Sequence, residues 1–173
     1  MDTLPHAISK QLLEFCGRIA PGRPVFVRSK PIAGAIQSAC FRNVREKVKR
    51  AGGSLVFGWA IWHLPHYYFE AEHHGVWCSP SGELLDVSPQ FNGYSEILFL
   101  RDDAAVYNPK SLRPNIIEPA SDSPAAQEVV QLSLRRNEIL NHYRTDEFVD
   151  FQLDSEDQMA VDAIDLRLST LLV

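Results

Sequence analysis

The sequence predicts an α+β fold in which helices pack against an antiparallel sheet. Apolar residues with helical spacing occupy the beginning and the end of the chain, whereas β-branched and aromatic runs fill its middle. A short turn connects two of the predicted strands, which makes them an antiparallel pair. The length of 173 residues suits one domain, or one domain with a small appendage.

In the first part of the chain, helical and strand-like segments alternate. A helix is expected over residues 4–19, where apolar side chains recur with helical spacing until Pro21-Gly22 stops the pattern. Residues 24–28 contain a short β-branched and aromatic run, which predicts a strand. Residues 36–51 form the clearest helix, with an apolar side chain every four residues and a glycine pair after its last turn.

The segments that follow predict the rest of the sheet and a helical C-terminal part. The run over 54–62 is nearly all apolar, as expected for a central strand that is covered on both faces. Further strands are expected over 67–72, 73–78, 83–87 and 97–100. Four prolines over residues 108–124 then mark a connector. The predicted divisions are an α+β core over 1–107, a proline-rich connector over 108–122 and a pair of helices over 123–173 that packs on the core.

Composition excludes several classes of partner. With 17 basic and 22 acidic residues the formal net charge is −5, so the chain lacks the basic footprint that nucleic-acid binding needs. No run approaches the ~18 apolar residues that span a membrane. The N-terminus lacks a basic region followed by an apolar run, so no secretory signal is expected. Three cysteines, an odd number, then favour free thiols and a cytoplasmic location. No cofactor is expected.

One hairpin in the middle of the chain predicts which side chains meet. Ser79-Pro80-Ser81-Gly82 fits a three-residue loop with a glycine bulge. That loop places Ser79 opposite Glu83, Asp86 opposite Val76 and Ser88 opposite His74. His74 and Asp86 then project from the same face as diagonal neighbours, with Cβ atoms about 7 Å apart or less. A two-residue turn would shift the register by one and select His73 instead.

Cys40, His74 and Asp86 are the candidate catalytic residues. Acyl transfer at a thiol needs a nucleophile, a base that accepts its proton and a group that fixes the tautomer of the base. The predicted function is therefore hydrolysis of an amide or peptide bond, or transamidation, with a peptide or other amide as the substrate. The residue at which the helix begins decides how close Cys40 lies to the positive end of the helix dipole. A start at Ile32 leaves Cys40 in mid-helix, whereas Ser38 as the N-cap brings it near the helix dipole.

The residues around this hairpin carry a resemblance to a known family. His74-Gly75-Val76-Trp77, Ser81-Gly82-Glu83-Leu84-Leu85 and Asp86-Val87-Ser88-Pro89 resemble the His/Asp hairpin of transglutaminase-like proteins, which share a papain-like core. The resemblance covers about 37–89 and implies a papain-like/transglutaminase-like fold with Cys40 at a helix N-terminus. Ser88 stands where that family has threonine. Related cell-wall peptidases have His-x-Gly-x-aromatic, which fits through His73, so His73 is an alternative base.

Two further residues are candidates for supporting roles at such a site. Gln37 lies just before the predicted helix and is a candidate hydrogen-bond donor to an oxyanion, together with the backbone N–H of Cys40. Asn43 lies one turn after Cys40 and shares its face. For both residues the alternative interpretation is a polar side chain that closes the end of a helix.

Two other classes of function use the same residues or the C-terminal part. His63, His66, His74 and Cys78 are nitrogen and sulfur donors of the kind zinc favours, although no spacing typical of a zinc motif accompanies them. Alternatively, the protein is a non-catalytic interaction module of the same fold. In that interpretation the C-terminal helices bind a protein partner or form a homodimer.

Overall fold

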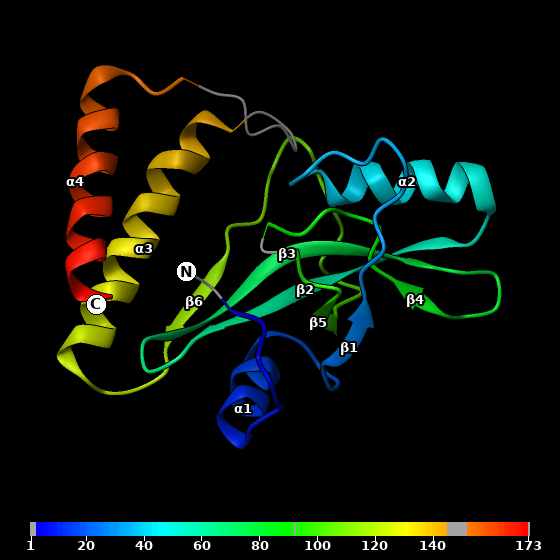
Figure 1. The fold of residues 1–173 in the computed structure, drawn as a ribbon, viewed down its shortest axis with the longest axis horizontal. Helices are drawn as coiled ribbons and strands as arrows, with labels where there is room; N and C mark the ends of the chain where they lie inside the picture. The colour runs from blue at the N-terminus through cyan, green and yellow to red at the C-terminus, as the bar shows by residue number, and fades with distance from the viewer. Residues whose placement is uncertain (1–2, 92, 145–151, 173) are drawn as a thin grey trace.

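The described residues form an α+β fold, with an antiparallel sheet and four helices (Figure 1). The computed structural model describes residues 3–91, 93–144 and 152–172. The strands follow the order β1-β5-β2-β3-β4, and β6 pairs with the other end of β3. Their bounds are β1 Val25–Arg28, β2 Ser54–Leu64, β3 Tyr68–Cys78, β4 Leu84–Leu85, β5 Glu96–Arg101 and β6 Ile116–Pro119.

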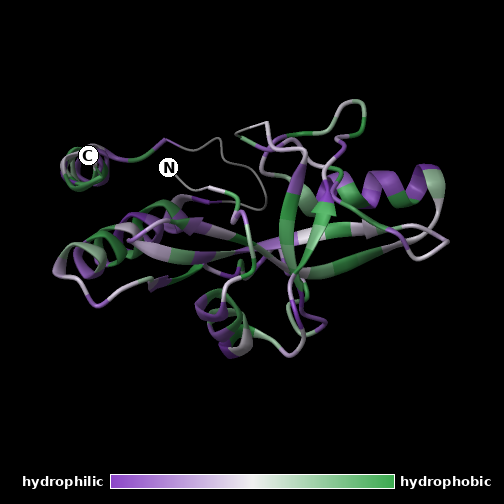
Figure 2. Cartoon of the chain, turned by 60° about the horizontal axis from the view of Figure 1, so that its bottom comes forward, coloured by the Kyte–Doolittle hydropathy of each residue, from purple (hydrophilic) through white to green (hydrophobic). Residues whose placement is uncertain are grey.

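The long hairpin of β2 and β3 forms the centre of the sheet, and two helices pack on different parts of it. Helix α1 (Lys10–Ile19) buries Leu12 and Phe15 against Trp59 and Ile61 of β2. Helix α2 (Cys40–Ala51) packs near the other end of the hairpin, where Val44 contacts Trp77. Figure 2 shows apolar residues along the strands and polar residues along much of α2, as expected for a helix with one exposed face.

Helix α2 begins later than the apolar pattern predicts. The expected start at residue 36, and the alternative at Ile32, are wrong, because the first helical residue is Cys40 and its N-cap is Ala39. Asn43 explains the difference. Its side-chain oxygen accepts from the Ile36 backbone N–H at 2.9 Å, and its amide donates to the Ile36 carbonyl at 2.7 Å. These bonds replace helical ones, and Ser38 has φ 61°, which a helix does not allow.

Gly75 of β3 allows α2 to lie directly on the sheet. A Cβ atom at this position would come within 2.8 Å of the Phe41 and Leu55 side chains. Phe41 follows Cys40 in the first turn of α2 and stacks on Tyr107, with ring centroids 4.3 Å apart. Because Gly75 has no side chain, the N-terminus of α2 can lie close to His74, which precedes Gly75 in β3.

The proline-rich segment predicted as a connector over 108–122 contains a strand. Within it, β6 extends the sheet at its edge, where Ile117 lies opposite Glu70 and Pro119 opposite Tyr68 of β3. Proline is tolerated there because an edge strand needs only part of its hydrogen bonds. The proline content of the segment predicts a connector and gives no indication of this short strand.

Two helices follow β6 along the chain. Helix α3 (Pro124–Tyr143) has Ser123 as its N-cap and packs Val129 and Val130 against the β6 end of the sheet. Helix α4 (Ser155–Leu171) lies beside α3 and joins the same apolar cluster through its C-terminal leucines (Figure 1). Among the described residues, no helix is long and apolar enough to cross a membrane.

Candidate functional site

The predicted hairpin register is confirmed. Trp77 lies opposite Leu85 and Cys78 opposite Leu84, and Gly82 adopts the left-handed φ of 88° that the bulged loop requires. The strand β4 is shorter than the expected 83–87 and ends at Leu85. His74 and Asp86 meet as the register predicts, with 3.2 Å between His74 Nε2 and Asp86 Oδ1.

Asp86 is completely buried, and its carboxylate oxygens accept four hydrogen bonds. Its Oδ1 accepts from His74 and from the Ser88 backbone N–H, at 3.2 and 3.1 Å. Its Oδ2 accepts from Ser29 Oγ at 2.7 Å and from Gln90 Nε2 at 2.6 Å. Burial alone would raise the pKa of Asp86, but the hydrogen bond and charge of His74, with the other donors, lower it below its usual value.

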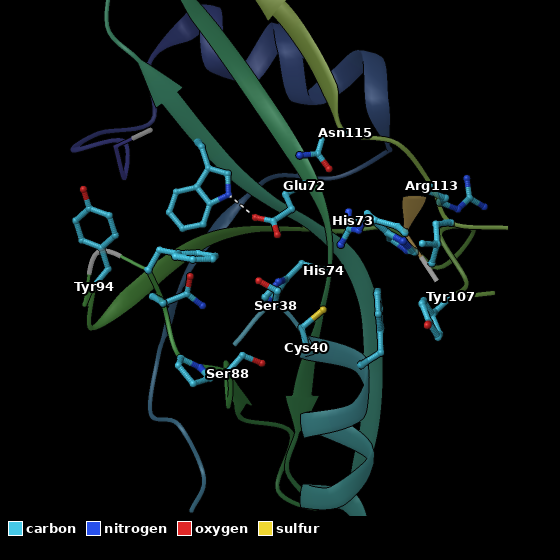
Figure 3. Close-up of a pocket in the computed structure, with 17 residues that line it drawn as sticks. Ser38, Cys40, Glu72, His73, His74, Ser88, Tyr94, Tyr107, Arg113 and Asn115 are labelled. Atoms are coloured by element: carbon cyan, nitrogen blue, oxygen red, sulfur yellow. Dashed lines mark hydrogen bonds between the residues drawn. The ribbon is translucent and has the colours of Figure 1, made fainter. Parts of the chain in front are cut away.

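Cys40 is the first residue of α2, and its side chain approaches His74. Figure 3 shows the sulfur at the start of the helix, directed toward the cavity and His74. Burial opposes a charged imidazolium, but a negatively charged Cys40 sulfur, and hydrogen bonds with Asp86 and Cys40, raise the pKa of His74 well above its usual value. Because Nε2 is bonded to Asp86, Nδ1 is the nitrogen available to the sulfur.

A cavity of about 150 Å³ opens beside these side chains. Cys40 and His74 line it, although they are only 8% and 5% exposed, so the sulfur and the ring face the cavity rather than bulk solvent. Aromatic side chains form much of the remaining wall, among them Trp62, Tyr94 and Tyr107 (Figure 3). Polar and charged side chains form the other part of the wall, so the cavity offers a ligand both apolar surface and convergent polar groups.

His73, the alternative base, also lines the cavity but is held by other contacts. Its Nε2 donates to the Ala105 carbonyl at 2.6 Å, and its ring packs against Phe41 and Trp59 with centroid distances of 4.8 and 5.4 Å. Burial lowers the pKa of His73, against the effect of its hydrogen bond to Ala105. The lowered pKa favours the neutral ring, and the hydrogen bond ties His73 to the loop that contains Ala105, whereas His74 is the histidine that bonds to a carboxylate.

The two supporting residues do not meet the sulfur as the sequence suggests. Gln37 is exposed and does not line the cavity. Asn43 is buried, and its side chain is occupied by Ile36 and by Ser88 Oγ, to which it donates at 3.1 Å. Asn43 therefore ties the segment before Cys40 to the residues that follow Asp86, and it has no hydrogen left for an oxyanion.

The predicted metal ligands are not brought together. His63 lies near the end of β2 and His66 in the turn that follows, whereas Cys78 lies at the far end of β3, ten residues from Tyr68. At about 3.3 Å per residue this separation is about 30 Å. In the described part of the chain, no group of three His, Cys, Asp or Glu side chains is placed to hold a metal ion. His63 instead stacks on Phe69 with centroids 4.6 Å apart.

Several residues of the site were not among the candidate site residues predicted from the sequence. Ser29 and Gln90 both bond to Asp86, and Glu72 and Ser38 line the cavity. Glu72 carried a signal, because strand alternation places it on the same face as His74, two residues away. Ser29 carried none, since its contact with Asp86 spans 57 residues of sequence.

Comparison with known protein families, with curated proteins and with solved structures finds no match to this chain. What the site does must therefore be argued from its own residues and geometry.

Proposed function

We propose that the protein is a thiol-dependent enzyme of transglutaminase-like type that transfers an acyl group from an amide, either to water or to an amine. The observation that carries this proposal is the series of contacts from Cys40 through His74 to Asp86 at the wall of one cavity. Sulfur, imidazole and carboxylate in contact form the machinery that activates a thiol for attack on a carbonyl.

The reaction takes place in two steps. The Cys40 sulfur attacks the carbonyl carbon of the amide, and His74 delivers its proton to the departing amine, which leaves a thioester on Cys40. Water or a second amine then attacks the thioester while His74 removes its proton, and the sulfur is released. Asp86 holds the His74 ring in one orientation through both steps, because four donors fix its buried carboxylate.

The N-terminus of α2 supplies donors for the oxyanion of each step. The Ala39 N-cap makes no side-chain hydrogen bond to the first turn, so the backbone N–H groups at Cys40 and Phe41 have no side-chain cap. These N–H groups point out of the N-terminus of α2, where the Cys40 sulfur lies. The positive end of the helix dipole is at the same place and also stabilises negative charge. This role replaces the one expected of Gln37. Free thiols of this kind fit a reducing, cytoplasmic environment.

Competitive alkylation with iodoacetamide at pH 6 tests the proposal. An ordinary cysteine with a pKa of about 8.5 is about 0.3% thiolate at this pH. The proposal assigns His74 as the base that accepts the Cys40 proton, so this sulfur should react faster than that of an ordinary cysteine. We expect Cys40 to be modified about tenfold faster than Cys78, which is more exposed and is measured in the same sample by mass spectrometry.

Two histidine variants provide matched controls for this measurement. His74→Gln removes the proton acceptor and should reduce the rate at Cys40 to that of Cys78 or below. His63→Gln removes a histidine that stacks on Phe69, outside the cavity lining, and should leave the rate unchanged. If iodoacetamide modifies Cys40 no faster than Cys78 in the wild-type protein, the proposed function is overturned.

A further inference from the structure

We propose that the cavity binds an alkylammonium group of the substrate at Glu72, beside Trp62. This inference rests on the proposed function, since it names a chemical group that the acyl-transfer substrate carries. It concerns the side of the cavity on which Figure 3 shows Tyr94 and Glu72, with Arg113 and Tyr107 on the opposite side.

Glu72 presents a carboxylate to the cavity that is only partly occupied. It lies on β3 two residues before His74, so both side chains project from the same face of the strand. The Trp62 indole N–H donates to Glu72 Oε2 at 3.0 Å, which fixes the carboxylate, and Oε1 remains for a ligand. Within the described ranges, no lysine or arginine side chain forms an ion pair with Glu72.

The rings beside Glu72 favour a cation for a second reason. Trp62 and Tyr94 stack with ring centroids 6.3 Å apart, and both line the cavity. The faces of aromatic rings carry negative charge density, which attracts ammonium groups, most strongly where water is displaced. Glu72, held beside the Trp62 ring, therefore offers an alkylammonium group both an ion pair and a cation–π contact. An anionic group would be repelled at the same place.

Among the described residues, neither of the two arginines that line the cavity forms an ion pair with Glu72. The Arg113 guanidinium donates to the Ala104 carbonyl at 2.7 Å and lies beyond His73 from Glu72 (Figure 3). Arg144 follows the last residue of α3, and its buried Nε has no hydrogen-bond partner. These arginines attract an anion, so a test of the inference must include an anionic probe.

Binding to the Cys40→Ala variant separates this inference from the proposed function, because no chemistry at sulfur is needed. Isothermal titration calorimetry compares the N-methylamides of N-acetyl-lysine, N-acetyl-norleucine and N-acetyl-glutamate. The lysine and norleucine probes have similar length and differ in charge. We expect the lysine probe to bind about tenfold tighter than the norleucine probe, with the glutamate probe weakest. Cadaverine is titrated separately, to distinguish binding of a free amine from binding of a peptide side chain.

A second substitution assigns the preference to Glu72. In the same Cys40→Ala background, Glu72→Gln keeps an oxygen that accepts from Trp62 but loses the charge, so the preference for lysine should disappear. Glu96→Gln makes the same change at an exposed residue outside the cavity lining and should leave the preference intact. Equal binding of lysine and norleucine probes, binding of neither, tighter binding of the glutamate probe, or a preference that survives Glu72→Gln would each overturn the inference, whatever the reactivity of Cys40.

Discussion

The substitution Gly75→Ala is predicted to disturb both the stability of the fold and the position of Cys40. The new Cβ would lie 2.8 Å from carbons of Phe41 and Leu55. Ordinary carbon contacts are about 3.5–4.0 Å, so one partner has to move by about 1 Å. Phe41 is 4% exposed and stacks on Tyr107, which leaves it no free space. Overpacking of this kind costs about 2 kcal/mol of the free energy of unfolding.

Urea unfolding measures the stability change. With a slope of about 2 kcal/mol/M, the midpoint of Gly75→Ala should fall by about 1 M. Gly17→Ala is the matched control, because Gly17 lies within α1 with no heavy atom within 4 Å of the added Cβ. That substitution should raise stability by about 1 kcal/mol, since alanine favours a helix more than glycine does.

The same displacement should reduce reactivity at Cys40. Phe41 directly follows Cys40, so a shift of about 1 Å at the ring moves the sulfur away from His74, and misplacement on this scale costs about 100-fold in rate. An unchanged urea midpoint together with unchanged alkylation of Cys40 would refute the argument that Gly75 sets the position of α2.

Two further predictions concern Asp86. Asp86→Asn should lower the free energy of unfolding by about 3 kcal/mol at pH 6 and remove acyl transfer, because the charged His74 ring loses its buried counterion. Ser29→Ala is the control, because it removes only one hydrogen bond to Asp86. This substitution should lower the free energy of unfolding by about 1 kcal/mol and leave acyl transfer measurable. The folded protein lowers the pKa of Asp86, so its contribution to stability is fully present above the unfolded value of about 3.9 and is lost as the pH falls through the lowered native value. The difference in urea midpoint between the wild type and Asp86→Asn should therefore decrease from pH 6 to pH 3, and a difference that stays constant with pH would contradict the prediction.

The parts of the site that follow from local rules were accessible from the sequence. Gly82 specifies a bulged loop, the loop fixes the register, and the alternation of side chains then places His74 beside Asp86. Each step uses residues within one hairpin, so no knowledge of the remaining fold is needed.

The parts that depend on distant contacts were not accessible in this way. The start of α2 at Cys40 is set by Asn43, which bonds to the Ile36 backbone and to Ser88, 45 residues away. The apolar spacing of the segment continues upstream of Cys40 and predicts a longer helix. Similarly, β6 is a strand because β3 offers it a free edge, and its prolines alone indicate a connector.

The direct test of the account is whether Cys40 forms a covalent acyl intermediate. Incubation with p-nitrophenyl acetate, followed by mass spectrometry of the digested protein, should find the acetyl group on Cys40, with release of p-nitrophenolate in a burst followed by slower turnover. Cys16 provides the internal negative control, because burial raises its pKa to about 11. An acetyl group that never resides on Cys40, or that resides there equally in the His74→Gln variant, would contradict the account.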